Sequence, residues 1–273
     1  MEQKNAIALV VFDWAGTTVD YGGAAPVKVF DKVFSAAGIR FTRQEINRPM
    51  GMEKKEHIRA LLQTESGAAQ WSAQWKRPWT EADVDALYQS FEEALGEIVA
   101  AHAKPIDGVV EAVAALRRTG IRIGSTTGYT AEMMRRVIPA AAQAGYAPEC
   151  VITPDITGFG RPGPSMLFEC MRRMQIYPPQ RVVKVGDTAV DIQEGKNAGA
   201  WSVGVLTGSN QLGLTREEAE ALDGQELAQR KSQARLAYWE AGADFVIDSM
   251  AELPELVRII NRRLACGYWR QSV

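Results

Sequence analysis

The sequence predicts an α/β protein: a doubly wound parallel-sheet (Rossmann-like) core with a small helical cap domain inserted after the first strand. Two observations predict this fold. In the last two thirds of the chain, short apolar runs suited to buried strands alternate with amphipathic segments of helical period. After the first apolar run, roughly eighty residues show helical periodicity alone. We therefore expect a core of residues 1–21 and 104–273 and a cap of residues 22–103.

Each expected helix or strand follows from the local pattern of apolar residues and from the residues that begin and end it. The first strand is the apolar run from Ile7 to Phe12, which ends at Asp13. In the cap we expect helices over residues 26–37, 52–62 and 81–103. In the core we expect helices over 109–118 and 130–144, and strands over 121–126, 150–153, 181–185, 202–206 and 244–247. The segment 214–241 is rich in Glu, Gln, Lys and Arg, which indicates a solvated pair of helices.

Composition and charge exclude several classes of protein. The chain is 46% hydrophobic and 23% charged, which is typical of a globular protein. A net charge of −2 gives no basic footprint for nucleic acid and no polybasic membrane signal, so we expect neither partner. The sequence shows no leader pattern and no membrane-spanning run, and Cys150, Cys170 and Cys266 have no metal-ligand spacing. We expect reduced thiols and a cytoplasmic location.

Polar residues follow four of the predicted strands at the point where each ends. Asp13 follows the first strand, Thr127 and Gly128 the second, Arg161 lies in the loop after the third, and Asp187 follows the fourth. Because the carboxyl ends of parallel strands share one edge, these groups should meet in one crevice. Such a set suits phosphoryl transfer.

Each group has a defined role in that chemistry. Carboxylates can hold Mg2+, Thr127 and the Gly128 amide can donate to phosphoryl oxygens, and Arg161 can clamp them. Asp13 can attack phosphorus as a nucleophile. Singly, each has a structural alternative: Thr127 or Asp191 as a helix cap, Arg161 as a surface cation, or Asp187 as a turn residue. Their order at successive strand ends favours catalysis.

The motifs that carry these groups resemble those of the haloacid dehalogenase superfamily of aspartyl-phosphate enzymes. The resemblance covers Asp13 with Gly16-Thr17-Thr18 and Asp20, then Thr127, Arg161, and Gly186-Asp187-Thr188 with Asp191. The predicted cap lies where that superfamily carries its mobile cap. Its phosphatases have a second Asp as general acid and base at the position of Ala15. Because such catalysis contributes about 10² to 10⁴ in rate, the leaving group here should need no proton on oxygen.

The cap contains a second candidate group. Met50, Lys54 and His57 are spaced four and three residues apart, which would place them on one face of a helix. A lysine desolvated by cap closure would have a pKa below its reference value of about 10.4 and could attack an aldehyde as a free amine. The iminium would then draw electrons from a carbon-phosphorus bond. The alternative is an ordinary solvated lysine.

Longer motifs resemble the phosphonatase family, the phosphonoacetaldehyde hydrolases. They are residues 12–22, Pro49-Met50-Gly51 with Lys54 and His57, residues 124–129, residues 160–162 and residues 185–188. The resemblance implies hydrolysis of the carbon-phosphorus bond of phosphonoacetaldehyde to acetaldehyde and phosphate, through a Schiff base on Lys54 and an aspartyl phosphate on Asp13.

The same resemblance implies the remaining parts of the site. Mg2+ would be held by Asp13, the Ala15 carbonyl and Asp187, with Asp191 supporting. Met50, His57 and Tyr129 would tune proton transfer around the lysine and the enamine. A homodimer would form through the caps. Gly23 stands where we would expect a cysteine in relatives, so a thiol there is not essential.

Two other functions remain open at this stage. A general Mg-dependent phosphatase or phosphomutase of the same superfamily is one, although Ala15 argues against it. A non-catalytic phosphate-binding or phospho-acceptor module is the other, since Asp13 and Asp187 would suffice for it. Neither gives Lys54 a role.

Overall fold

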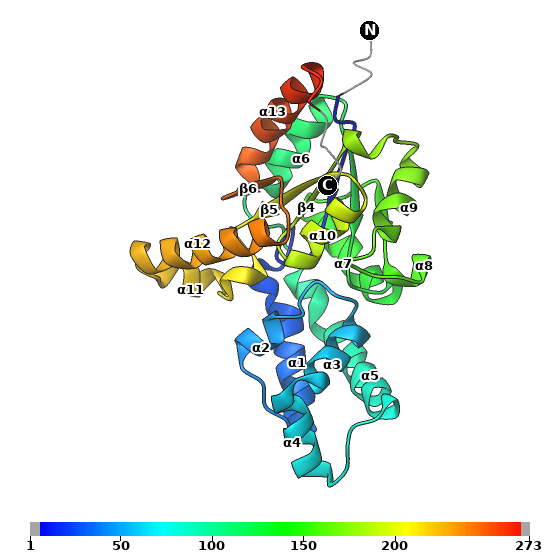
Figure 1. The fold of residues 1–273 in the computed structure, drawn as a ribbon, viewed down its shortest axis with the longest axis vertical. Coiled ribbons are helices and arrows are strands. Elements are labelled where there is room, and N and C mark those ends of the chain that lie inside the picture. Colours follow the sequence, from blue (N-terminus) through cyan, green and yellow to red (C-terminus); the bar gives the residue numbers. More distant parts are fainter. Residues whose placement is uncertain (1–5, 269–273) are drawn as a thin grey trace.

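A single parallel sheet organises the computed structural model, which describes residues 6–268 (Figure 1). Its strands, in the spatial order β3-β2-β1-β4-β5-β6, are β1 (Leu9–Phe12), β2 (Arg122–Thr126), β3 (Cys150–Ile152), β4 (Val182–Gly186), β5 (Trp201–Val205) and β6 (Phe245–Ile247). Every neighbouring pair is parallel. The predicted α/β doubly wound class is confirmed, and each strand lies within two residues of its expected bounds.

Helices cover both faces of the sheet, as right-handed crossovers require. Val10 and Phe12 of β1 point into the core shared with α6 (Val109–Arg118), α7 (Ala131–Gln143) and α13 (Leu253–Ala265). Leu9 and Val11 point to the other face, which is covered by α9 (Ser165–Met174), α10 (Ala189–Asn197) and α12 (Gly224–Glu240). This alternation buries β1 on both faces.

Shorter elements complete the core. They are two short helices, α8 (Pro154–Thr157) and α11 (Arg216–Ala221), and four 3-10 turns at Tyr21–Gly23, Pro179–Arg181, Asn210–Leu212 and Met250–Glu252. The expectation that 214–241 is a solvated helical pair is partly wrong. Tyr238 and Ala234 of α12 and Ala219 of α11 are buried against the core, because one face of the pair packs there. Among residues 6–268, no helix is long and apolar enough to cross a membrane.

The chain between β1 and α6 forms a helical unit at one end of the molecule, drawn in blue to cyan in Figure 1. It contains α1 (Ala24–Ala36), α2 (Arg43–Asn47), α3 (Lys54–Gln63), α4 (Glu65–Trp75), α5 (Glu81–Ile98) and a 3-10 turn at Val99–His102. Phe30 stacks on His57 and Phe91 with ring centres 4.0 and 4.4 Å apart, which ties α1, α3 and α5 together. The exact domain boundaries at residues 22 and 103 stay a prediction.

Three details of this unit differ from expectation. Helices α2 and α4 were not predicted, and the last turn of the 81–103 helix tightens into the 3-10 form after Ile98. The 52–62 helix starts later, at Lys54, because Glu53 accepts hydrogen bonds from the backbone of Lys55 and Glu56 and so caps it. Met50 therefore precedes the helix and does not share its face.

Two glycines allow the helical unit to lie closed on the core. A Cβ on Gly51, which has φ +90°, would lie 2.4 Å from the Thr188 Oγ1 atom. A Cβ on Gly128 would lie 2.5 Å from the Met52 carbonyl oxygen. Gly51 of the helical unit thus meets the Thr188 side chain of the core, and Gly128 of the core meets the backbone of Met52. This contact, the glycine seam, has no room for a methyl group at either place.

We expect Gly51→Ala to hold the helical unit away from the core. Left-handed strain in alanine costs about 1–2 kcal/mol of stability, and the new methyl group adds a collision with Thr188. Gly120→Ala is the matched control, because Gly120 has φ +82° and a Cβ added there would meet nothing within 4 Å. Small-angle scattering should show a larger radius of gyration for Gly51→Ala alone. Equal radii of gyration for the two variants would contradict the claim that Gly51 allows the helical unit to lie closed on the core.

Candidate active site

The site lies at the carboxyl ends of β1 and β4, where the order of strands in the sheet reverses. Asp13 follows β1 and Asp187 follows β4. A cavity of about 20 Å³, enough for about one water, opens beside them. Its lining is Asp13, Ala15, Pro26, Met50, Gly51, Lys54, Thr127, Gly128, Tyr129, Arg161, Thr188 and Asn210. The structure therefore brings eight of the eleven candidate site residues to one cavity between the helical unit and the core.

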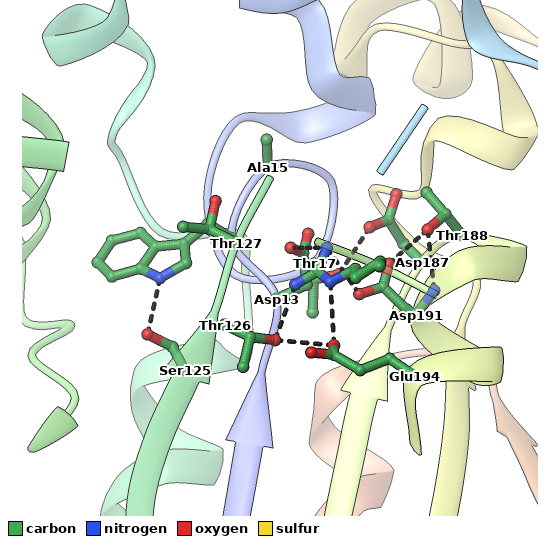
Figure 2. A network of polar contacts seen from close by, with 12 residues as sticks. Asp13, Ala15, Thr17, Ser125, Thr126, Thr127, Asp187, Thr188, Asp191 and Glu194 are labelled. Carbon is green, nitrogen blue, oxygen red and sulfur yellow. Dashed lines mark hydrogen bonds and ion pairs between the residues drawn. The ribbon is translucent and has the colours of Figure 1, made fainter. Parts of the chain in front are cut away.

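Three aspartates form an acidic cluster beneath the cavity. Asp13, Asp187 and Asp191 each offer an oxygen atom, and these atoms lie within 4.8 Å of one another. Thr17 donates its hydroxyl to Asp187 Oδ1 at 2.7 Å, and Thr188 donates to Asp191 Oδ2 at 2.5 Å. Figure 2 shows these side chains converging from the ends of the strands.

Two buried cations, Arg161 and Lys184, form ion pairs with carboxylates of this cluster. Arg161 Nη1 lies 2.6 Å from Asp13 Oδ1 and 2.9 Å from Asp191 Oδ1, and its Nε donates to Glu194 Oε2 at 3.0 Å. Lys184 Nζ lies 2.9 Å from Asp191 Oδ1 and 3.2 Å from Glu194 Oε2. The Thr126 hydroxyl donates to Glu194 (Figure 2). It accepts hydrogen bonds from both cations. Arg161 is thus fully buried among carboxylates, which excludes the surface-cation alternative.

The charges of this cluster fit a divalent metal ion. Four carboxylates (Asp13, Asp187, Asp191, Glu194) face two cations, which leaves two negative charges uncompensated when all are ionised. Burial, with repulsion from Asp13 and Asp191, raises the pKa of Asp187 to about 8. Asp13, Asp187 and the Ala15 carbonyl offer the oxygen ligands that Mg2+ prefers, whereas Asp191 is already engaged by Arg161 and Lys184.

Lys54 reaches the same cavity from the other side. It is the first residue of α3, is only 3% exposed, and its Nζ lies 3.8 Å from Met50 Sδ. Tyr129 and Phe30 present their rings to it, with centres 5.4 and 5.9 Å from Nζ. Burial lowers the pKa of Lys54 from its usual 10.5 to about 8, although the Asp13 charge opposes this. The solvated-lysine alternative is excluded.

His57 and Tyr129 occupy different positions around Lys54. His57 is fully buried and does not line the cavity; its Nε2–H donates to the Ile46 carbonyl at 2.9 Å. Burial and the Lys54 charge hold the pKa of His57 well below its usual value, so the ring is neutral. Tyr129 lines the cavity, and its buried hydroxyl has no hydrogen-bond partner within residues 6–268.

The second strand end supplies neutral donors. Thr127 Oγ1 accepts from the Tyr129 backbone N–H at 3.1 Å, which leaves the hydroxyl proton of Thr127 available to the cavity. The helix-cap alternative for Thr127 is wrong, because Thr130 caps α7. Asp191 lies in the first turn of α10, whose cap is Thr188.

Several residues of the site were missed in the sequence. Lys184 stands inside an otherwise apolar strand, which was a usable signal, since a buried lysine needs a partner. Glu194 follows Asp191 by three residues on α10 and so shares its side of the helix. Asn210 and Tyr238 carried no signal; the Tyr238 hydroxyl donates to the Asp187 carbonyl oxygen at 2.7 Å from 51 residues away.

Comparisons with known proteins agree with this site. A family model described as haloacid dehalogenase-like hydrolase matches residues 7–199, and a related hydrolase-like model matches residues 158–253. Proteins named phosphonoacetaldehyde hydrolase from Bacillus cytotoxicus and Bacillus cereus are 46% and 45% identical over 257 residues, which is 94% of this chain and 97% of each relative.

Solved structures show the same pattern. A phosphonoacetaldehyde hydrolase-like protein from Oleispira antarctica superposes with a TM-score of 0.94 at 37% identity, over 97% of this chain and 96% of that one. A putative phosphoglycolate phosphatase from Lactobacillus delbrueckii has a TM-score of 0.64 at 17% identity, over 93% and 98% of the two chains, and so shares the fold alone.

Proposed function

Because this chain belongs to the phosphonoacetaldehyde hydrolases of the haloacid dehalogenase superfamily, we propose that it hydrolyses the carbon-phosphorus bond of phosphonoacetaldehyde to acetaldehyde and phosphate. The names of the relatives suggest the substrate. The observation that carries the proposal is the buried amine of Lys54, which lines the same small cavity as the Asp13 carboxylate.

Lys54 is proposed to activate the substrate. Its amine adds to the aldehyde carbon, water leaves, and a protonated imine joins the substrate to the enzyme. A pKa of about 8 in place of 10.5 raises the share of free amine at neutral pH by roughly 300-fold. This gain comes from burial in the closed helical unit, which we propose acts as a cap.

Asp13 is proposed to accept the phosphoryl group. Its carboxylate attacks phosphorus, the carbon-phosphorus bond breaks, and the bonding electrons pass to the iminium nitrogen to give an enamine. The enamine is protonated at carbon and hydrolysed to acetaldehyde and free Lys54, and a second water hydrolyses the aspartyl phosphate. In the phosphoryl transfer the leaving atom is carbon, so no leaving oxygen needs a proton in that step, which agrees with the methyl group of Ala15 in the cavity lining.

The remaining groups bind and orient the substrate in this proposal. Thr127, the Gly128 amide and Arg161 donate to phosphoryl oxygens, and Arg161 also holds Asp13 directed at phosphorus. Mg2+, held by Asp13, the Ala15 carbonyl and Asp187 with Asp191 in support, would neutralise charge between the nucleophile and the phosphoryl oxygens.

Three residues surround the reacting amine. Met50 offers a thioether sulfur to the ammonium of Lys54, and Tyr129 places a ring and an unpaired hydroxyl beside it. His57 lies behind Lys54 in the cap and is neutral. We propose that Met50 and Tyr129 tune proton transfer directly, and that His57 does so through the position and charge state of Lys54.

The same proposal covers assembly and location. A groove of about 440 Å³ runs between α1, α4 and α5, and Trp75 at its edge is 48% exposed. We propose that a second copy of the chain covers it, which would give a homodimer through the caps.

Cys150, Cys170 and Cys266 form no disulfide, which supports a cytoplasmic location; fractionation of the source cells tests this.

Lys54→Arg tests the function, because arginine keeps the charge but forms no imine under these conditions. We expect turnover of phosphonoacetaldehyde to fall by at least 10³-fold, the scale of losing a covalent catalyst, and borohydride trapping of a two-carbon adduct to disappear. Lys55→Arg is the control, since Lys55 pairs with Asp85 on the outside of α3. Full activity in Lys54→Arg would refute imine catalysis. Turnover of simple phosphate esters with none of phosphonoacetaldehyde would favour a general phosphatase.

Trapping should depend on pH in a defined sense. Below pH 8 most Lys54 is protonated, so the rate of borohydride inactivation with substrate should rise about tenfold per pH unit and level off above about pH 8. Mass mapping of the peptide that contains Lys54 follows this rate. A midpoint near 10.5 would mean that Lys54 is solvated in the working enzyme.

Light scattering tests the dimer. The wild-type protein should have twice the 30.0 kDa mass of the chain, and Trp75→Glu should be monomeric, because a carboxylate cannot be buried unpaired at an apolar contact. Tyr177→Glu, at an exposed residue of the core, should stay dimeric. A wild-type mass of one chain would rule the proposal out.

A further inference from the structure

One side chain bridges two of the groups that would hold the metal. Asn210 is the first residue of the 3-10 turn Asn210–Leu212 that follows β5, and it is 3% exposed. Its Nδ2 donates to Asp187 Oδ2 at 2.7 Å and to the Ala15 carbonyl oxygen at 3.2 Å. Its backbone N–H donates to the same Asp187 oxygen at 2.8 Å. Asn210 thus joins the loop after β1 to the loop after β4.

The chemistry of these partners fixes the orientation of the amide. A carboxylate oxygen and a backbone carbonyl oxygen only accept hydrogen bonds, so the NH2 group must face them and uses both of its protons there. The amide oxygen of Asn210 points the other way, toward Gly23, and has no hydrogen-bond partner within residues 6–268.

Two glycines form the slot that holds this amide. A Cβ on Gly23 would lie 2.0 Å from the amide oxygen of Asn210, and a Cβ on Gly16 would lie 2.4 Å from its nitrogen. Gly23 has φ +57° and Gly16 has φ +88°, conformations that favour glycine. A side chain at residue 23 would have to displace the amide, so Asn210 and Gly23 fit as a pair.

We propose that Asn210 is a positioning residue of the metal site, and that Gly23 is required because it leaves room for the Asn210 amide. The carboxylate of Asp187 and the carbonyl of Ala15 both present negative oxygens, which repel each other. The NH2 group between them donates to both oxygens and so offsets that repulsion. Groups that hydrogen-bond to metal ligands commonly change metal affinity by about 10 to 100-fold. This inference rests on the proposed Mg2+ site.

Asn210→Ala tests the inference through binding of Mg2+ alone. By titration calorimetry without substrate, its Kd for Mg2+ should rise by about 10 to 100-fold. Gln211→Ala is the control: it lies on the same turn but is exposed, and its side chain makes no contact with Asp187. A lower melting temperature with an unchanged Kd would show a purely structural role and overturn the inference.

Gly23→Ala tests the slot separately. In the wild-type background it should weaken Mg2+ binding, because the new methyl group displaces the Asn210 amide. Combined with Asn210→Ala, it should weaken binding no further, since the colliding amide is gone. Losses that multiply in the double variant would overturn the pairing of the two residues.

The two levels of proposal fail in different ways. If the wild-type protein binds no Mg2+, both the metal-dependent function and the role of Asn210 are refuted. If it binds Mg2+ and turns over phosphonoacetaldehyde while Asn210→Ala keeps the wild-type Kd, the role of Asn210 alone falls.

Discussion

Four buried carboxylates that repel one another constrain the rest of the structure: Asp13 and Asp187, which follow β1 and β4, and Asp191 and Glu194, which lie on α10. Arg161 and Lys184 offset part of that repulsion, and Asp13 still lines the cavity. Burial, together with the charges of Asp13 and Asp191, raises the pKa of Asp187. Removing one member of such a buried group generally costs about 3–5 kcal/mol, so the strands, the loop that carries Arg161 and the first turns of α10 are fixed together.

The helical unit contributes a different kind of chemistry. The core gathers buried charges at the strand ends, whereas α3 places the Lys54 amine in a buried site that disfavours its charged form. Burial raises the pKa of Asp13, which the Arg161 charge opposes, and lowers the pKa of Lys54, which the Asp13 charge opposes. The lowered pKa of Lys54 therefore depends on the helical unit lying closed on the core.

The sequence predicted the sheet and most of the site because both depend on local patterns. A buried parallel strand is a continuous apolar run, and the groups that follow such strands, Asp13 and Asp187 among them, must meet at one edge. Asn210 could not be found this way, because its contacts arise where loops about 195 residues apart come together. The placement of Met50 was wrong because periodicity does not show that Glu53 caps the helix; a cap decides where a periodic run begins.

In the proposed mechanism, the glycine seam at Gly51 and Gly128 also controls the access of water to the cavity. In the proposed mechanism, formation of the imine releases one water, and hydrolysis of the enamine product and of the aspartyl phosphate each consume one, yet the closed cavity has room for about one. Phosphonoacetaldehyde is itself larger than that space. A catalytic cycle of this kind would require the contacts at Gly51 and Gly128 to open for substrate and products, so that intermediates would meet bulk water only in the open state. In that mechanism, two glycines that lack a side chain would decide how tightly the reacting groups are shielded from water.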